Sequence, residues 1–233
     1  MKEKKMNRRG FLTTGLAAGA GIVSATAASA GKQSSGKIKI VGISCSPRKG
    51  KTTATAVNVA LEAAKTVNSQ IETQLIDLGG MNISGWTGGA KPGEGQQVKD
   101  DFDSVLPMLR DPIPDGLIIG SPSYFRTMSS LCKAFLERIA VLRSPTLLLA
   151  NKPVGVLSVG AYRNGGQELV IEQIQTAMLC HEVMIVGGKP PAHQGATLWN
   201  AYNDDITKDE FGIESARQLG VRVAEAALLL AQK

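Results

Sequence analysis

Aromatic residues are scarce in this chain: they make up 4% of the 233 residues, whereas 43% are hydrophobic. A packed core must therefore be built from Val, Ile, Leu and Ala. A strong charge excess is also missing from most of the chain. The net charge is +6, but residues 1–30 carry five basic residues against one acidic, which leaves 21 basic and 19 acidic residues elsewhere. No Lys/Arg run with interleaved aromatic residues occurs there, so we predict no nucleic-acid partner.

Cysteine and histidine are also few. The three cysteines are an odd number without paired spacing, which does not indicate a disulfide framework. Cys132 and Cys180 fall in helical patterns and are predicted to be small buried side chains. His181 and His193 stand alone, and the sequence contains no Cys-x-x-Cys. We therefore predict no metal site.

One weakly apolar run lies in the first thirty residues. A basic stretch with Arg8 and Arg9 leads into an uncharged run that starts at Phe11 and ends in the small-x-small pattern 28–30. This order predicts a signal peptide over residues 1–30. It resembles a twin-arginine signal, which implies the twin-arginine translocase as a partner and a periplasmic or cell-envelope location. The alternative is a membrane anchor that is never cleaved. No later stretch is long and apolar enough to span a bilayer.

After a flexible linker over residues 31–36, short apolar segments alternate with helical patterns. The alternation predicts a single α/β domain over residues 37–233, with a five-stranded parallel sheet between two helical layers. Ligands of such sheets bind beyond the carboxyl ends of the strands, where strand order reverses. We therefore expect the site in the loops after strands one, three and four. The expected strands are 38–43, 71–78, 117–119, 154–159 and 183–186, and the expected helices begin near 52, 131, 167 and 213.

The loop after the first strand, residues 44–53, is polar and cationic and runs directly into a helix. Hydroxyls, helix N-terminal amides and cationic side chains suit an anion. The alternative is an ordinary capped turn. Gly50-Lys51-Thr52 matches the end of a nucleoside-triphosphate loop, but Cys45 stands where that motif needs its first glycine. The dinucleotide fingerprint G-x-G-x-x-G is absent.

Residues 46–53 resemble the Gly-Ser-Pro-Arg-Lys-x-Gly-Asn-Thr phosphate loop of the NAD(P)H-dependent FMN reductase and iron–sulfur flavoprotein families. The resemblance covers roughly residues 37–233. It implies a flavodoxin-like fold, FMN as cofactor, NAD(P)H as a possible electron donor, and a homodimer or homotetramer. It also implies that Ser46, Arg48, Thr52 and Thr53 hold the FMN phosphate, with Lys51 where those families often have Asn.

Two further loops agree with this resemblance. Residues 120–129 are similar to the families' Gly-(Ser/Thr)-Pro-x-Tyr loop, in which Pro122 fixes the turn and Tyr124 and Phe125 offer flat apolar surface to the flavin ring. The alternative is that these aromatics close the core. Residues 160–168 form a Gly-rich loop whose amides can approach a ligand closely, although Asn-Gly-Gly is also a common turn. The residues expected to bind FMN are Ser44, Ser46, Arg48, Lys51, Thr52, Thr53, Pro122, Ser123, Tyr124, Phe125, Gly160, Tyr162, Asn164, Gly165 and Gly166.

The chain departs from these families in two respects. Residues 81–95 contain no cysteine, so we expect no iron–sulfur cluster; this Gly-rich segment around Trp86 is either a mobile flap or a surface loop. The leader would also separate the protein from cytoplasmic nicotinamides. We expect an FMN-dependent oxidoreductase with hydride transfer through flavin N5 and no protein acid or base, acting on a small molecule or a redox protein. The alternatives are a non-enzymatic flavodoxin-type electron carrier and a binding protein that has lost its flavin.

Overall fold

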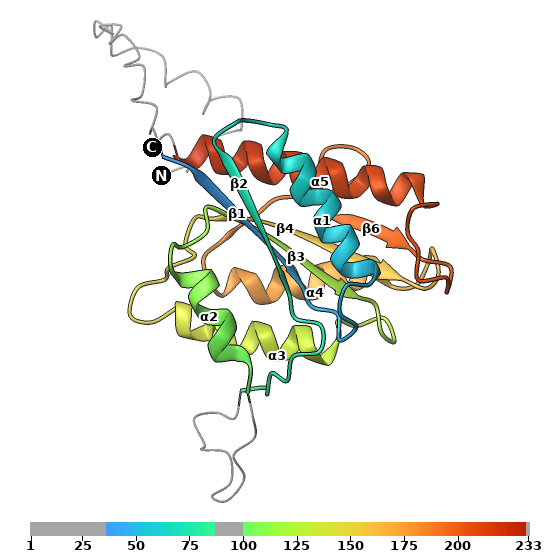
Figure 1. Ribbon diagram of the computed structural model, residues 1–233, viewed down its shortest axis with the longest axis horizontal. Coiled ribbons are helices and arrows are strands. Elements are labelled where there is room, and N and C mark those ends of the chain that lie inside the picture. Colours follow the sequence, from blue (N-terminus) through green and yellow to red (C-terminus); the bar gives the residue numbers. More distant parts are fainter. Residues whose placement is uncertain (1–35, 87–99, 232–233) are drawn as a thin grey trace, which may run out of the picture. The chain divides into compact units, whose positions relative to one another are not determined.

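The computed structural model describes residues 36–86 and 100–231, and the predicted leader lies outside these residues. Within them the chain forms the parallel α/β sandwich that the sequence predicts (Figure 1). The sheet order is β2-β1-β3-β4-β5, and every pairing is parallel. The strands are β1 (Ile38–Ser44), β2 (Ile71–Asp77), β3 (Gly116–Pro122), β4 (Pro153–Gly160), β5 (Met184–Ile185) and β6 (Ala196–Trp199). The helices are α1 (Thr52–Lys65), α2 (Phe102–Arg110), α3 (Ser130–Arg138), the 3₁₀ turn η1 (Ile139–Leu142), α4 (Gln167–Leu179) and α5 (Glu210–Ala231).

The fifth position in the sheet is shared by two short strands. β5 pairs with Pro153 and Val154 at the start of β4, and β6 pairs with residues 157–160 at its end. The prediction of five strand positions is confirmed, but the fifth strand is shorter than 183–186 and β6 was not predicted. The excursion between β5 and β6 contains Pro190 and Pro191, which have no N–H to donate to a sheet ladder.

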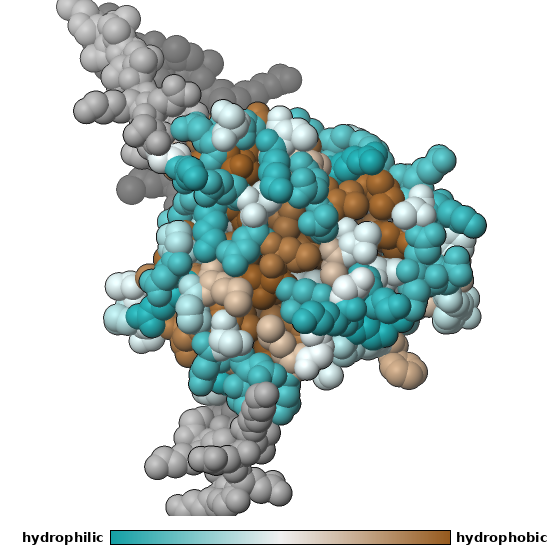
Figure 2. Space-filling model, viewed as in Figure 1, coloured by the Kyte–Doolittle hydropathy of each residue, from teal (hydrophilic) through white to brown (hydrophobic). Residues whose placement is uncertain are grey.

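Two apolar layers cover the sheet. α1 and α5 pack on one face, and α2, α3 and α4 cover the other (Figure 1). The residues that fill both layers are mainly Val, Ile, Leu and Ala, as the composition predicts. On the face drawn in Figure 2, apolar residues lie between the polar outer surfaces of the helices. Among residues 36–86 and 100–231, no helix has the length and hydropathy needed to cross a bilayer.

Three local predictions need correction. The helix α2 was not predicted; it contains Pro107, and its buried face comprises three residues, Phe102, Val105 and Leu109, which is too short a pattern to stand out. The helix after β3 ends at Arg138 and continues as the 3₁₀ turn η1. Cys132 is buried as expected, but Cys180 is exposed, because it lies at the C-terminal cap of α4 beyond the packed face.

Candidate functional site

The loops after β1, β3 and β4 meet at the carboxyl edge of the sheet and are bonded to one another. The Ser129 hydroxyl after β3 donates to the Cys45 carbonyl after β1 at 2.6 Å. The Ser123 hydroxyl donates to the Gly165 carbonyl after β4, also at 2.6 Å. These bonds arise because parallel strands end at the same edge and neighbouring positions carry the three loops. The structure therefore brings the three predicted loops together.

The loop after β1 has the geometry of an anion site. Gly50 adopts φ +66°, which favours glycine, and its N–H donates to the Asp77 carboxylate at 2.7 Å. The helix α1 then begins at Thr52 without a side-chain cap and without an acidic residue in its first turn. The free amides and the positive end of the helix dipole are thus available to an anion. The alternative of an ordinary side-chain-capped turn is wrong.

Buried hydroxyls lie beneath this loop. Ser44, Ser46, Thr52 and Thr53 are all nearly inaccessible to solvent. Ser44 shares the α1-facing side of β1 with Gly42, since a Cβ on Gly42 would meet Val57 and Leu61 of α1. Its hydroxyl has no hydrogen-bond partner within residues 36–86 and 100–231. A buried polar atom without a partner is costly, and protein atoms leave this hydroxyl almost no surface for a ligand to touch.

Two of the three cations of the loop contact an acidic residue that the sequence did not indicate. Arg48 Nη1 lies 2.5 Å from Asp204 Oδ1, and Lys51 Nζ lies 3.7 Å from Asp204 Oδ2. The hydrogen bond to Arg48 is the main reason why the pKa of Asp204 is lowered, and it likewise raises the pKa of Arg48. Asp204 lies 156 residues downstream of Arg48 in the sequence, so no local pattern could have revealed the contact.

The loop after β3 is a tight hairpin turn. Tyr124 and Thr127 exchange backbone hydrogen bonds of 2.9 and 3.0 Å, and both central residues are left-handed, with φ +51° at Phe125 and +65° at Arg126. Such turns normally carry Asn or Gly. Phe125 is fully exposed at the tip and Tyr124 is 38% exposed. The alternative that these aromatics close the core is therefore wrong, and both rings are available at the site.

The loop after β4 packs against this hairpin. Gly166 has φ +87°, and a Cβ there would lie 2.8 Å from the Cα of Arg126, so a larger residue does not fit. The Gln167 amide donates to the Tyr162 carbonyl at 2.6 Å and to the Leu198 carbonyl at 3.0 Å, which ties the loop to β6. Tyr162 remains 62% exposed. The predicted residues 160–166 thus lie at the same edge as the other two loops.

A buried carboxylate supports the far side of this loop. Asp209 is 1% exposed at its side chain and pairs with Arg163. It also accepts hydrogen bonds from Trp199 N at 2.7 Å and Gly212 N at 2.9 Å. The Arg163 guanidinium lies 5.5 Å from the Trp199 ring centre. Asp209 therefore joins β6, α5 and the Gly-rich loop, a role that the sequence did not indicate.

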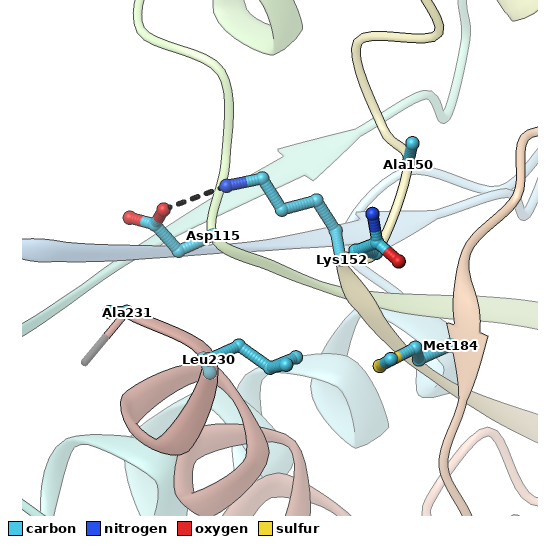
Figure 3. Close-up of a pocket in the computed structure, with 8 residues that line it drawn as sticks. Asp115, Ala150, Lys152, Met184, Leu230 and Ala231 are labelled. Atoms are coloured by element: carbon cyan, nitrogen blue, oxygen red, sulfur yellow. Dashed lines mark hydrogen bonds and ion pairs between the residues drawn. The ribbon is translucent and has the colours of Figure 1, made fainter. Parts of the chain in front are cut away.

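A cavity of about 410 Å³ lies at the opposite edge of the sheet, where Asp115 and Lys152 form an ion pair of 3.1 Å (Figure 3). The Asp115 carboxylate also accepts from Lys39 N, so its oxygens already have partners, and the cavity is remote from the three loops. No group of three or more His, Cys, Asp or Glu side chains that could hold a metal occurs in residues 36–86 and 100–231.

Comparison with known proteins agrees with this geometry. The family model for NADPH-dependent FMN reductase matches residues 38–197. An iron–sulfur flavoprotein of Methanocaldococcus jannaschii is 38% identical over 196 residues, which cover 83% of this chain and 99% of that protein. An iron–sulfur flavoprotein of Methanosarcina thermophila is 32% identical, with coverage of 78% and 93%. The fold also matches RosB, solved with bound 8-demethyl-8-formylriboflavin-5′-phosphate, at TM-score 0.65 and 15% identity over 83% of this chain and 80% of that one.

The chain belongs to the NADPH-dependent FMN reductase family. It is a flavin-dependent oxidoreductase, and its cofactor is FMN. The prediction of family, fold and cofactor from the three loops is therefore confirmed. The individual FMN contacts of the fifteen predicted residues stay predictions.

Proposed function

We propose that the chain binds FMN across the three loops and transfers hydride through flavin N5 between a nicotinamide donor and an acceptor. The acceptor is a quinone, another electrophilic aromatic or a redox protein. The observation that carries this proposal is the anion site after β1: an uncapped helix start flanked by Arg48 and Lys51. The flavin supplies the redox chemistry when bound, and the chain binds and orients it.

The residues divide by the part of FMN that they would hold. Ser46, Arg48, Lys51, Thr52 and Thr53 would bind the phosphate. Tyr124 and Phe125 would present aromatic surface to the ring system. The backbone amides of residues 164–166 would face the N1/O2 edge, where hydrogen-bond donors stabilise developing negative charge. We further propose a homo-oligomer, which light scattering on the purified protein tests directly.

Export through the twin-arginine route is also part of the proposal. It is supported by Arg8 and Arg9 before Phe11 and by the small residues at 28–30. This location favours a second candidate function, an electron carrier that receives electrons from an envelope donor, because reduced nicotinamides belong to the cytoplasm. No iron–sulfur cluster is proposed, since residues 81–95 contain no cysteine.

The test is an absorbance spectrum of the purified protein followed by anaerobic titration with NADH and NADPH. Rapid bleaching of the flavin bands by either nucleotide supports the reductase. Flavin bands indifferent to both support the carrier. A colourless protein that does not bind added FMN overturns both functions.

A matched pair of variants tests the phosphate site. Arg48→Gln should weaken FMN binding by about tenfold or more, because hydrogen bonds to charged groups are strong, while riboflavin binding changes little. Arg217→Gln on α5 is the control, since Arg217 is 58% exposed and pairs with Glu214, one turn away on the same helix. Equal effects of the two substitutions on FMN binding would place the phosphate elsewhere.

A further inference from the structure

The segment Asn200–Asp204, here called the clasp, connects two of the three loops. It follows β6 and precedes α5. At one end, Asn200 N donates to the Gly160 carbonyl at 3.0 Å, and the Tyr202 ring packs edge-to-face on Tyr162 with centroids 4.9 Å apart. At the other end, Asp204 contacts the cations of the loop after β1. The clasp therefore bridges the Gly-rich loop and the proposed phosphate loop.

The clasp is held in an unfavourable backbone conformation. Ala201, Tyr202 and Asp204 have φ of +48°, +59° and +50°, a region that side chains with a Cβ adopt at a cost. Asn200 stabilises the turn: its Oδ1 accepts from Tyr202 N at 3.1 Å and its carbonyl accepts from Asn203 N at 2.8 Å. This turn brings the Asp204 carboxylate into contact with Arg48 and Lys51, which precede α1.

The charges of Arg48, Lys51 and Asp204 together determine how strongly this part of the site attracts an anionic ligand. Arg48 and Lys51 each contact a different oxygen of Asp204, so half of their combined charge is already neutralised. A phosphate monoester carries about −1.5 to −2 charges at neutral pH. At the same cations it would meet both a reduced positive charge and a like-charged neighbour, and like charges repel.

We propose that Asp204 sets the affinity for the flavin phosphate: its carboxylate competes with the phosphate monoester for Arg48 and Lys51. This inference rests on the proposed function, in which the loop after β1 holds the FMN phosphate. FMN binds less tightly to this chain than it would to the same loop without the Asp204 carboxylate. This loss of affinity applies to FMN but not to riboflavin, which lacks the phosphate.

The experiment compares Asp204→Asn with Asp205→Asn. Asn keeps the size of Asp204 and an oxygen that accepts from Arg48, so only the charge is removed. Asp205 is the matched control, because it lies in the next position and its carboxylate accepts from Thr207 N at 2.8 Å, not from the loop cations. Dissociation constants for FMN and riboflavin are measured by calorimetry on the flavin-free full chain, at low salt and at roughly 0.3 M salt, where screening is strong.

We expect Asp204→Asn to bind FMN roughly three- to tenfold more tightly at low salt, with riboflavin unchanged and Asp205→Asn within about twofold of wild type. The gain should shrink at high salt. Unchanged or weaker FMN binding by Asp204→Asn overturns the inference, and weaker binding would make Asp204 a residue that orients Arg48. If the wild type binds FMN no better than riboflavin, the proposed phosphate site fails and the inference fails with it.

Discussion

Replacing Asp209 by Ala should destabilise the protein far more than replacing its partner Arg163. The Asp209 carboxylate is 1% exposed and accepts from Trp199 N, Gly212 N and Arg163, whereas the Arg163 side chain is 42% exposed. Removing the carboxylate leaves buried backbone donors without acceptors. Removing the guanidinium leaves a carboxylate that keeps two backbone hydrogen bonds.

The magnitudes follow from these partners. Each buried donor left unsatisfied costs about 1–3 kcal/mol, so Asp209→Ala should lose roughly 3–5 kcal/mol of unfolding free energy. Arg163→Met should lose less, about 1–2 kcal/mol, because it leaves a buried carboxylate that keeps its two backbone hydrogen bonds. For a domain of this size the first change lowers Tm by roughly 6–20 °C.

Urea unfolding followed by circular dichroism, on the flavin-free protein, measures both variants without a contribution from ligand binding. Asp209→Asn is an informative third variant, since its amide oxygen still accepts from one backbone donor and should restore part of the loss. The reasoning is refuted if Asp209→Ala stays within about 1 kcal/mol of wild type. It is also refuted if Arg163→Met is as damaging as Asp209→Ala.

Other expected outcomes concern separate parts of the structure. Gly166→Ala should lower the free energy of unfolding by about 2–4 kcal/mol, because of its positive φ and the backbone of Arg126 2.8 Å from the new Cβ; a change below about 1 kcal/mol in urea unfolding would contradict this. Phe125→Asn should raise stability by about 0.5–1 kcal/mol, because Asn tolerates φ +51° and the exposed ring packs on nothing within the core; a lower Tm would show that the ring has a partner. Burial, followed by the charge of Arg143, lowers the pKa of His181 below its usual 6.5. Folding therefore favours the neutral imidazole, and stability should be full above pH 6.5 and fall as the pH drops through the lowered pKa; His181→Gln should flatten that part of a pH–stability profile.

The three loops of the site were predictable because each is a local motif at the end of a buried strand. Gly50, Pro122 and Gly166 mark turns in the sequence itself, and their neighbours carry the hydroxyls, amides and cations of the site. The parallel alternation of strands and helices then requires that all three loops end at one edge. Family, fold and cofactor followed from these features, and the comparisons confirmed them.

The division of the fifth strand position between β5 and β6 was harder to predict from the sequence. β5 and β6 contain only two and four residues, and neither has enough length to show a strand period. Their position is decided by pairing with the two halves of β4. The helix α2 was missed for a similar reason, since its buried face comprises only three residues.

By itself, the sequence determined the alternation of buried strands and helices, the Val/Ile/Leu/Ala core and the chemistry of the three loops, because periodicity, turn residues and side-chain type are local properties. Only the tertiary structure decided that Asp204 meets Arg48 and Lys51 and that Asp209 supports the Gly-rich loop. These contacts join residues 46 or more positions apart in the sequence, and they exist only because the chain after β6 crosses the carboxyl edge of the sheet before α5 begins. A charge on a surface segment has no partner until folding places one beside it.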